Sequence, residues 1–263
     1  MEIKRVNILG VGVSAINMSQ ALSVIASWLE KRQPHYVCVS NVHSIMSCQR
    51  DPALRAIHNQ AGMVTPDGMP LVWLSRQAGY RHVERVYGPD LLLALCKYGL
   101  ARGYRHFFYG GDAGVAQRLA DRLQARFPTL QVAGAFTPPF GDLSAAEDAE
   151  ITEHLARSGA HIIWVGLGMP KQERWMAAHV GRLPQVLIGV GAAFDFHSGN
   201  KRQAPLWMQR RGLEWLFRLM SEPHRLWRRY LTTIPPFIVL AAVQRLGLRR
   251  YILPTEQLTE DQV

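Results

Sequence analysis

One aspartate in the sequence stands in a rigid turn. The segment Met63-Val64-Thr65-Pro66-Asp67-Gly68-Met69-Pro70 sets Asp67 between two prolines and beside a glycine. Rigid surroundings position a carboxylate at low conformational cost, as a general base requires. The alternative is a turn aspartate that hydrogen-bonds its own backbone. Arg85 begins the next rigid turn, where it could hold a phosphate or orient Asp67.

A second cluster of polar loop residues runs from Gly166 to Trp175. Two glycines, Gly166 and Gly168, precede a proline and the polar run Lys171-Gln172-Glu173-Arg174. Proline is favoured in the first turn of a helix, and the backbone N–H groups of a helix start attract anions. We therefore predict a site for an anion and a hydroxyl group here, since an ordinary capped helix does not need both glycines.

Two glycine-rich segments resemble nucleotide-binding turns. Gly10-Val11-Gly12-Val13-Ser14-Ala15 matches a dinucleotide fingerprint, but the next predicted strand ends in Ser40-Asn41, without the carboxylate that would bind the ribose. A tight turn in a leading hairpin is the preferred interpretation. Gly189 to Asp195 could approach a diphosphate, and Asp195 could accept from a ribose hydroxyl or cap a helix.

Metal and disulfide chemistry are not indicated. The sequence has three cysteines, Cys38, Cys48 and Cys96, which are too scattered to suggest a disulfide framework or a zinc site. No Asp-x-Asp pair ends a predicted strand, so a magnesium-bridged diphosphate site is not indicated either. We predict no metal site and no cofactor. Some charge other than a metal must then stabilise any leaving diphosphate, and arginines are available for this.

The fold predicted around these residues is α/β, a Rossmann-like and mostly parallel sheet with helices on both faces. Short β-branched or aromatic runs alternate with segments of helical periodicity. Three strands end in glycine, before Gly110-Gly111, Gly166 and Gly191, and ligands bind at the carboxyl ends of parallel strands. The predicted strands are Tyr36 to Val39, His106 to Tyr109, Leu130 to Ala133, Ile162 to Val165 and Val186 to Val190. The predicted helices are Ala15 to Lys31, Asp51 to Gln60, Asp90 to Arg102, Ala113 to Phe127, Ser144 to Ser158 and Lys171 to His179.

The positive charge is concentrated near the C-terminus. The 263 residues carry a formal net charge of +10. Between Lys201 and Arg250, eleven Lys or Arg stand against two acids, Glu214 and Glu222. We predict an α/β core over 1–199 and a basic amphipathic helical appendage over 200–263, broken at Pro235-Pro236. Its charge suits nucleic acid, anionic lipid headgroups or a phosphorylated lipid. No signal peptide and no membrane-spanning run is expected, so the protein would lie on a membrane rather than cross it.

Motifs spread over most of the chain resemble the WecG/TagA/CpsF glycosyltransferases of bacterial surface-polysaccharide assembly. The order and spacing of these motifs cover roughly Val6 to Tyr230 and are specific as a set. They are Asn41, Pro66-Asp67-Gly68, Arg85-x-x-Gly88, Tyr109-Gly110-Gly111, Gly166 to Glu173, Gly189 to Phe196, and Arg202-x-x-Pro205 leading to Gly212-Leu213-Glu214-Trp215-Leu216-Phe217-Arg218-Leu219.

The resemblance implies an inverting, metal-independent transferase. It would move glucose, N-acetylmannosamine or its uronic acid from a UDP-sugar to a polyprenyl-diphosphate-linked saccharide, in surface polysaccharide or exopolysaccharide synthesis. Asp67 falls on the family's general base. Substrate-binding roles fall on Asn41, Arg85, Gly110, Gly111, Phe140 (stacked on uracil), Gly166, Gln172, Asp195 (at the nucleotide), and Arg218, Arg225 and Arg228 (on the diphosphates).

The resemblance also implies where the protein acts. A peripheral position on the cytoplasmic face of the bacterial inner membrane is expected, with an anionic membrane surface as a partner and no nucleic acid. Trp227, Tyr230, Phe237 and Tyr251 are expected at headgroup depth. Members of this family can self-associate, so the resemblance leaves both a monomer and a homo-oligomer as expectations. Two rivals are kept: a nicotinamide-dependent oxidoreductase built on the Gly10 turn, and a basic nucleic-acid-binding protein.

Overall fold

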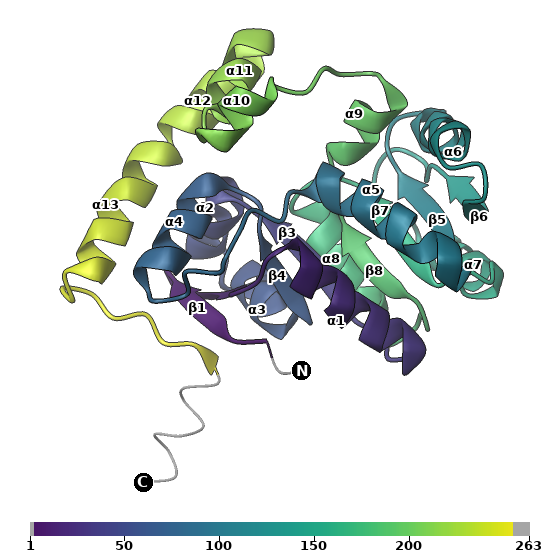
Figure 1. Cartoon of the computed structure of the whole chain (residues 1–263), viewed down its shortest axis with the longest axis horizontal. Coiled ribbons are helices and arrows are strands. Elements are labelled where there is room, and N and C mark those ends of the chain that lie inside the picture. The colour runs from purple at the N-terminus through teal and green to yellow at the C-terminus, as the bar shows by residue number, and fades with distance from the viewer. Residues whose placement is uncertain (1–2, 255–263) are drawn as a thin grey trace, which may run out of the picture. The chain divides into compact units, whose positions relative to one another are not determined.

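A computed structural model describes residues 3–254, which form two compact units. Unit 1 consists of residues 3–17, 40–85 and 203–254, and unit 2 of residues 18–39 and 86–202. The colours of Figure 1 show that unit 1 is built from both ends of the chain together with one internal segment. The two units are described in turn.

The sheet has six parallel strands in the order β4-β3-β8-β7-β5-β6. This confirms the predicted α/β class with a Rossmann-like parallel sheet. All five predicted strands are present, and β4, which comes from unit 1, was seen in the sequence only as the apolar approach to a turn. The strands are β3 (Tyr36–Ser40), β4 (Met63–Pro66), β5 (Arg105–Gly110), β6 (Gln131–Phe136), β7 (Ile162–Gly166) and β8 (Val186–Gly189).

The helices of unit 2 follow the predicted segments closely. The bounds of α8 are as predicted, and the other ends differ by a few residues, the usual uncertainty of helix ends. Ser144 begins α7 with a capping box, in which its side chain accepts from the Glu147 N–H and the Glu147 carboxylate accepts in return. These helices are α1 (Met18–Glu30), α5 (Gly88–Gly99), the 3-10 helix η1 (Leu100–Arg102), α6 (Val115–Arg126), α7 (Ala145–Arg157), α8 (Lys171–His179) and α9 (Ala193–Ser198).

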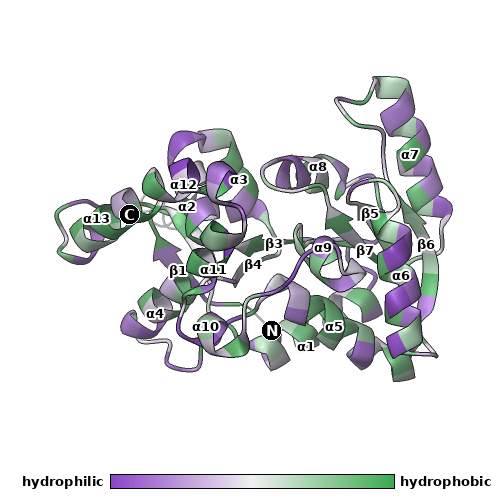
Figure 2. Cartoon of the chain, turned by 90° about the horizontal axis from the view of Figure 1, so that it is seen from above, coloured by the Kyte–Doolittle hydropathy of each residue, from purple (hydrophilic) through white to green (hydrophobic). Residues whose placement is uncertain are grey.

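Alternate residues of β5 show how the strands of unit 2 are covered on both faces. Tyr109 packs against Trp175 of α8 with ring centroids 4.6 Å apart. Phe108 points the other way and meets Phe194 of α9 at 6.2 Å. Figure 2 shows α7 and α8 on one side of these strands and α1, α5 and α6 on the other. Both faces of the strands are therefore apolar, as their continuous hydrophobic runs require.

In unit 1 the first glycine motif forms a hairpin. Strands β1 (Arg5–Ile8) and β2 (Val11–Ser14) pair antiparallel, and the two turn residues Leu9 and Gly10 have φ of 51° and 77°. Positive φ at both central residues is characteristic of a type I′ hairpin turn. The preferred interpretation of this motif is confirmed. The Gly10 turn does not open a helix as a dinucleotide fingerprint must.

The remaining elements of unit 1 are helices, and the basic C-terminal segment contributes four of them. Within the predicted amphipathic appendage, Gly212 (φ 71°) and Pro223 divide the part before Pro235 into three helices. Pro235 and Pro236 lie in the first turn of the last helix, where missing N–H groups cost no hydrogen bond. The helices are α2 (Val42–Arg50), α3 (Pro52–Gln60), α4 (Met69–Gln77), α10 (Leu206–Arg210), α11 (Glu214–Ser221), α12 (Pro223–Leu231) and α13 (Ile234–Arg245).

Helix α13 is hydrogen-bonded to the β1–β2 hairpin. The Gln244 side chain accepts from the Leu9 N–H at 2.9 Å and donates to the Asn7 carbonyl at 2.8 Å. The Asn7 amide in turn donates to the Tyr251 carbonyl. Phe237 is buried, so the expectation that its ring lies at headgroup depth is wrong. The first and last described segments of the chain are therefore parts of one structure.

Candidate functional site

Asp67 stands at the carboxyl end of β4, directly before the first turn of α4. All four residues of β4 are buried, and Asp67 itself is 9% exposed. Its N–H donates to the Ser40 carbonyl at 2.9 Å. Gly68 follows because space is short: a Cβ there would lie 3.3 Å from the Cβ of Asn41. The backbone at Asp67 is thus fixed on both sides.

Asn41 has two roles at the start of α2. Its Oδ1 caps the helix by accepting from the N–H groups of His43 at 3.0 Å and Ser44 at 3.4 Å. Capping with the oxygen turns the amide nitrogen outward, and Nδ2 lies 3.4 Å from Oδ2 of Asp67. The predicted pocket residue Asn41 therefore contacts the predicted base.

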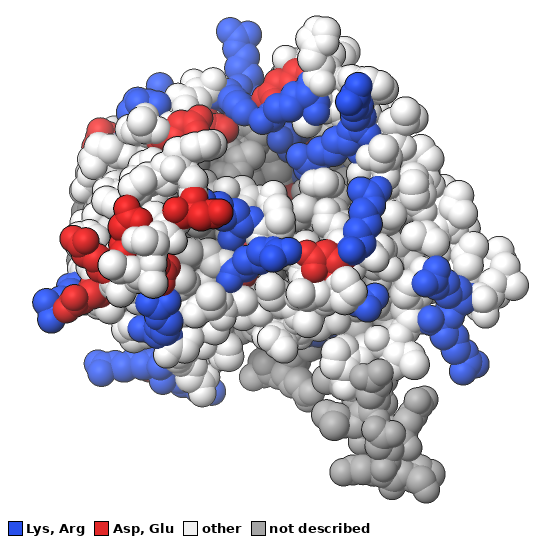
Figure 3. Space-filling view, turned by 180° about the vertical axis from the view of Figure 1, so that it is seen from behind, with Lys and Arg blue, Asp and Glu red and all other residues white. Residues whose placement is uncertain are grey.

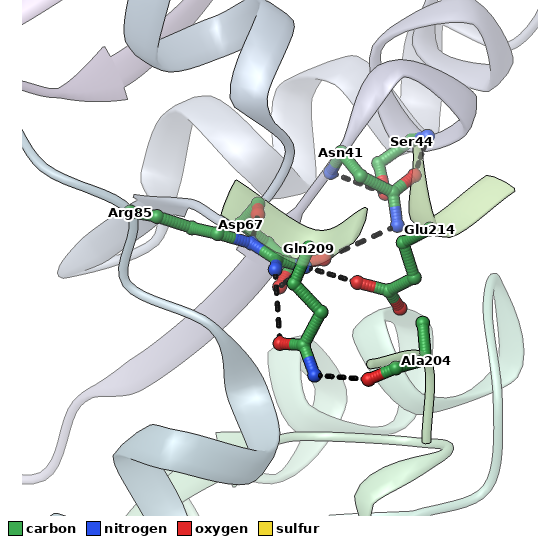
Figure 4. A network of polar contacts seen from close by, with 7 residues as sticks. All are labelled: Asn41, Ser44, Asp67, Arg85, Ala204, Gln209 and Glu214. Carbon is green, nitrogen blue, oxygen red and sulfur yellow. Dashed lines mark hydrogen bonds and ion pairs between the residues drawn. The ribbon is translucent and has the colours of Figure 1, made fainter. Parts of the chain in front are cut away.

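Arg85 approaches Asp67 from the segment that leads to α5. Its Nε donates to the Asp67 carbonyl, and its Nη2 lies 3.9 Å from the Asp67 carboxylate. The same Nη2 lies 2.5 Å from Oε2 of Glu214, and Nη1 lies 3.4 Å from Oε1 of Gln209. Figure 4 shows the guanidinium directed into this group of side chains. Of the two sequence interpretations of Arg85, contact with Asp67 is therefore present in the structure.

Sequence reasoning did not assign Glu214 and Gln209 to the site. Both come from the C-terminal segment, Gln209 on α10 and Glu214 as the first residue of α11. Gln209 is held by its own donation to the Ala204 carbonyl at 2.7 Å. The available signal was that Glu214 is one of two acids within a basic segment. An isolated acid in such surroundings indicates a specific cationic partner.

The predicted diphosphate arginines lie on α11 and α12, and a cluster of cations surrounds one of them. Figure 3 shows several blue Lys and Arg side chains close together in the upper part of that view. Burial, followed by the charges of Arg229, Arg50 and Arg218, lowers the pKa of His43 to about 4. Burial and then the Arg218 charge also lower the pKa of Arg229. Closely spaced cations of this kind favour an anionic ligand.

The other two predicted arginines have different surroundings. Arg225 pairs with Glu222 one turn earlier, and Arg228 is exposed with its guanidinium 5.2 Å from the Trp227 ring centroid. The sequence missed Arg229 and His43, which lie with Arg218. The resemblance that assigned Arg218, Arg225 and Arg228 did not reveal them, since Arg229 and His43 come to Arg218 from two other helices, α12 and α2.

In unit 2, Gly110 and Gly166 bring the ends of β5 and β7 into close contact. The two residues are paired in the sheet, and the Gly111 N–H donates to the Gly166 carbonyl at 2.9 Å. A Cβ on Gly110, whose φ is 115°, would lie 2.7 Å from the Gly166 carbonyl carbon. Only glycine allows this approach, so the three predicted glycines form one backbone feature at the carboxyl ends of the strands.

Gln172 and Glu173, in the first turn of α8, form a buried pair beside the end of β8. The Gln172 Nε2 donates to the Glu173 carboxylate at 2.9 Å. A Cβ on Gly191 would lie 3.4 Å from the Gln172 Oε1. Burial raises the pKa of Glu173, and the Gln172 hydrogen bond opposes that rise. Gln172 Oε1 has no hydrogen-bond partner within residues 3–254, so it can accept from a ligand.

Asp195 and Phe140 lie elsewhere in unit 2. Asp195 is in α9, whose N-cap is Ala192, so the helix-capping interpretation of Asp195 is wrong. Its carboxylate instead lies 3.4 Å from the Lys201 ammonium. Phe140 is fully exposed in the loop between β6 and α7, next to Gly141, whose carbonyl accepts from Lys171 at 2.6 Å. The structure brings neither residue against the other predicted ligands of its unit.

Comparison with known proteins decides the family. The model of the "Glycosyl transferase WecG/TagA/CpsF family" matches residues 6–251. The chain belongs to this family. It is a glycosyltransferase, as the motifs predicted.

Three relatives carry the same printed name, "N-acetylglucosaminyldiphosphoundecaprenol N-acetyl-beta-D-mannosaminyltransferase". One from Bacillus spizizenii is 30% identical over 213 residues, which cover 81% of this chain and 80% of the relative. One from Bacillus subtilis is 28% identical, covering 84% and 87%. One from Staphylococcus aureus strain MRSA252 is 24% identical, covering 94% and 95%.

The described part of this glycosyltransferase has neither a cluster of metal ligands nor a membrane-spanning helix. Between residues 3 and 254, no three His, Cys, Asp or Glu side chains gather as a metal site would require. Over the same residues, no helix combines the length and apolar character needed to span a membrane. Metal independence stays a prediction.

Proposed function

We propose that this glycosyltransferase moves a hexose or N-acetylhexosamine from a UDP-sugar to a polyprenyl-diphosphate-linked saccharide, with inversion and without a metal. The observation that supports it best is the Asp67 carboxylate, fixed after β4 and contacted by Asn41 and Arg85. The relatives' printed name makes UDP-N-acetylmannosamine the first donor to test, and a diphosphoundecaprenol-linked N-acetylglucosamine the first acceptor. The product would enter a surface polysaccharide or exopolysaccharide.

The proposed reaction is a single displacement. Asp67 takes the proton of an acceptor hydroxyl while that oxygen forms a bond to the anomeric carbon. The bond from this carbon to UDP breaks on the opposite face, and UDP leaves with the electron pair. The configuration of the sugar is thereby inverted. Arg85 and the arginines of α11 and α12 would stabilise the charge on the diphosphates.

In unit 2 we assign the nucleotide to the strand-end glycines and to Gln172. The bare backbone at Gly110, Gly111 and Gly166 would let a phosphate approach closely, and the unpaired Gln172 Oε1 suits an N–H or O–H donor of the nucleotide. Phe140 would stack on uracil, and Asp195 would accept from a ribose hydroxyl. The diphosphates of donor and acceptor would be the anions that the Arg218, Arg225 and Arg228 side chains bind.

We further propose that the enzyme lies peripherally on the cytoplasmic face of the inner membrane. Exposed apolar side chains of the C-terminal segment, among them Trp227 and Ile238, accompany its arginines. Apolar side chains beside cations suit an anionic lipid surface. Co-sedimentation with phosphatidylglycerol vesicles, compared with phosphatidylcholine vesicles, tests this, and equal binding to both would contradict it. The capacity to self-associate is tested by sedimentation velocity over a range of concentrations.

The central experiment is a direct transfer assay in EDTA with the Asp67→Asn variant. A neutral amide cannot take the proton, so turnover should fall about 100-fold or more, the usual contribution of a general base. Glu84→Gln is the matched control, because Glu84 is an exposed carboxylate one residue from Arg85. Its removal should leave turnover at the wild-type level. UDP binding should survive in both variants. Near wild-type turnover of Asp67→Asn would refute the base assignment.

The same assay tests the other parts of the proposal. A panel of UDP-glucose, UDP-N-acetylglucosamine and UDP-N-acetylmannosamine identifies the donor, and the anomeric proton signal of the product reports inversion or retention. Loss of activity in EDTA that added metal restores would contradict metal independence. Binding of NADH or an oligonucleotide, with no response to UDP, would favour the two rival functions instead.

A further inference from the structure

We propose that Glu214 is a positioning residue, which holds the Arg85 guanidinium away from full pairing with Asp67 so that the Asp67 carboxylate stays basic enough to take the acceptor proton. The inference rests on the proposed function and adds to it a residue of the C-terminal segment. Glu214 does not touch substrate in this proposal and acts through Arg85.

The distances show how the guanidinium is shared. The same nitrogen, Nη2 of Arg85, lies 2.5 Å from the Glu214 carboxylate and 3.9 Å from the Asp67 carboxylate. One cation therefore stands between two anions and is much closer to Glu214. All three side chains are largely buried, with exposed fractions of 17% for Arg85, 12% for Asp67 and 16% for Glu214. Screening by solvent is weak at such exposure, so the sharing has an electrostatic effect.

The other contacts of Arg85 limit how far it can move. Nε donates to the backbone carbonyl of Asp67, and Nη1 reaches Gln209, which is itself held by the Ala204 carbonyl. These contacts keep the arginine beside Asp67, while the Glu214 carboxylate accepts the charged hydrogen bond from Nη2. Figure 4 shows Asn41, Arg85 and Glu214 reaching the Asp67 region from different segments.

The chemical need for this sharing follows from the role of the base. A cation within about 4–6 Å that is not shared lowers a carboxyl pKa by about 1 to 3 units and makes a weaker base. Arg85 would do so if Glu214 were neutral. Glu214 thus allows an arginine to serve the diphosphate next to a carboxylate that must still accept a proton.

The neighbouring titratable groups do not change this conclusion. On α2, His43 is neutral at assay pH because its pKa is lowered to about 4. On α12, burial raises the pKa of the Tyr230 hydroxyl, so it is neutral as well. Arg218 on α11 and Arg229 on α12 stay protonated throughout the assay range. In this proposal the acid limb of the pH profile therefore reports protonation of the base, Asp67.

The test is the pH dependence of kcat in Glu214→Gln. We expect kcat to fall about 10-fold at neutral pH, which is less than the roughly 100-fold that loss of a general base costs, because Asp67 becomes a weaker base but is still present. The acid limb of the profile should move to lower pH. KM for the donor should change little. Glu153→Gln is the matched control, since it removes the same charge from an exposed ion pair with Arg157, a residue to which no role is assigned. This control should keep the wild-type profile.

Two further variants keep the test decisive. Glu214→Asp retains the negative charge but moves it farther from Arg85, because the side chain is one methylene shorter. It should therefore shift the acid limb to lower pH by less than Glu214→Gln does. This variant provides the test if Glu214→Gln does not fold. In the Arg85→Lys background, Glu214→Gln should cost much less than in wild type, because the two residues act as one unit. A Glu214→Gln profile with an unmoved acid limb, or full additivity with Arg85→Lys, would overturn the proposal.

Failure of this inference can be told from failure of the proposed function. If Asp67→Asn is inactive while Glu214→Gln matches wild type, the Glu214 role is wrong and the base assignment stands. If Asp67→Asn is as active as wild type, both are wrong.

Discussion

Replacing Gly110 with alanine tests whether the contact of β5 with β7 demands glycine. Gly110 has a φ of 115°, and its new Cβ would lie 2.7 Å from the Gly166 carbonyl carbon and 2.9 Å from its oxygen. The positive φ costs a residue with a side chain about 1–2 kcal/mol. Forcing a methyl group against backbone that is paired in a sheet adds about 1–3 kcal/mol. We therefore expect a loss of roughly 3 kcal/mol in the free energy of unfolding.

Gly141 provides a matched control. Its φ is 110°, and apart from its two chain neighbours no heavy atom of residues 3–254 lies within 4 Å of the position its Cβ would take. Gly141→Ala therefore carries the conformational cost without the steric one. At about 2–4 °C per kcal/mol, the 3 kcal/mol of Gly110→Ala should lower the melting temperature by about 6–12 °C. The 1–2 kcal/mol of Gly141→Ala should lower it by about 2–8 °C, and in the same experiment always by less than Gly110→Ala.

The assay is thermal unfolding of both variants by circular dichroism, repeated with saturating UDP. Because Gly110 lies at the proposed nucleotide site, Gly110→Ala should also lose most of the UDP-induced rise in melting temperature. Gly141→Ala should keep that rise. Equal melting temperatures for the two variants would refute the argument, because the close approach to Gly166 would then have no energetic weight.

The remaining predictions concern Asn41 and Glu173. Asn41→Ser keeps an oxygen to cap α2 and should leave the melting temperature near wild type, while Asn41→Ala should lose about 1 kcal/mol of folding stability. Both variants lack the amide that lies beside Asp67, so both should lower turnover. A fully active Asn41→Ser would contradict the role of Asn41 in the pocket. Burial raises the pKa of Glu173 in the folded chain, so its contribution to stability is present below the unfolded pKa of about 4.3 and is lost as pH rises through the folded value. Glu173→Gln should therefore gain melting temperature relative to wild type between pH 4 and pH 8, and a difference that stays constant with pH would contradict the shift.

Much of unit 2 could be predicted from the sequence because its signals are local. Glycines mark the ends of β5, β7 and β8, and α8 was predicted with its observed bounds. Asp67 could also be singled out, since prolines and glycine fix its turn whatever lies around it. Strand β4 was missed as a strand because four buried residues show no alternation of apolar and polar side chains.

The surroundings of Asp67 could not be predicted in the same way. Its contact with Arg85, and the contact of Arg85 with Glu214, join residues far apart in the chain. Periodicity shows which face of a helix is apolar, but it does not show which element that face meets. For the same reason the family resemblance indicated Arg218 and missed Arg229, which tertiary packing brings to His43. The roles of the nucleotide-binding residues stay predictions until ligands are bound.

The assembly of unit 1 from three chain segments has a consequence for biosynthesis. Asn41, Asp67 and Arg85 leave the ribosome early, whereas Gln209 and Glu214 belong to the last segment, which also carries the Gln244 contacts to the first hairpin. At bacterial or eukaryotic translation rates of about 5–20 residues per second, Arg85 waits on the order of ten seconds for Glu214 to be made. A nascent or prematurely terminated chain therefore carries the Asp67 carboxylate without its complete surroundings, and the cluster forms only when translation is nearly finished.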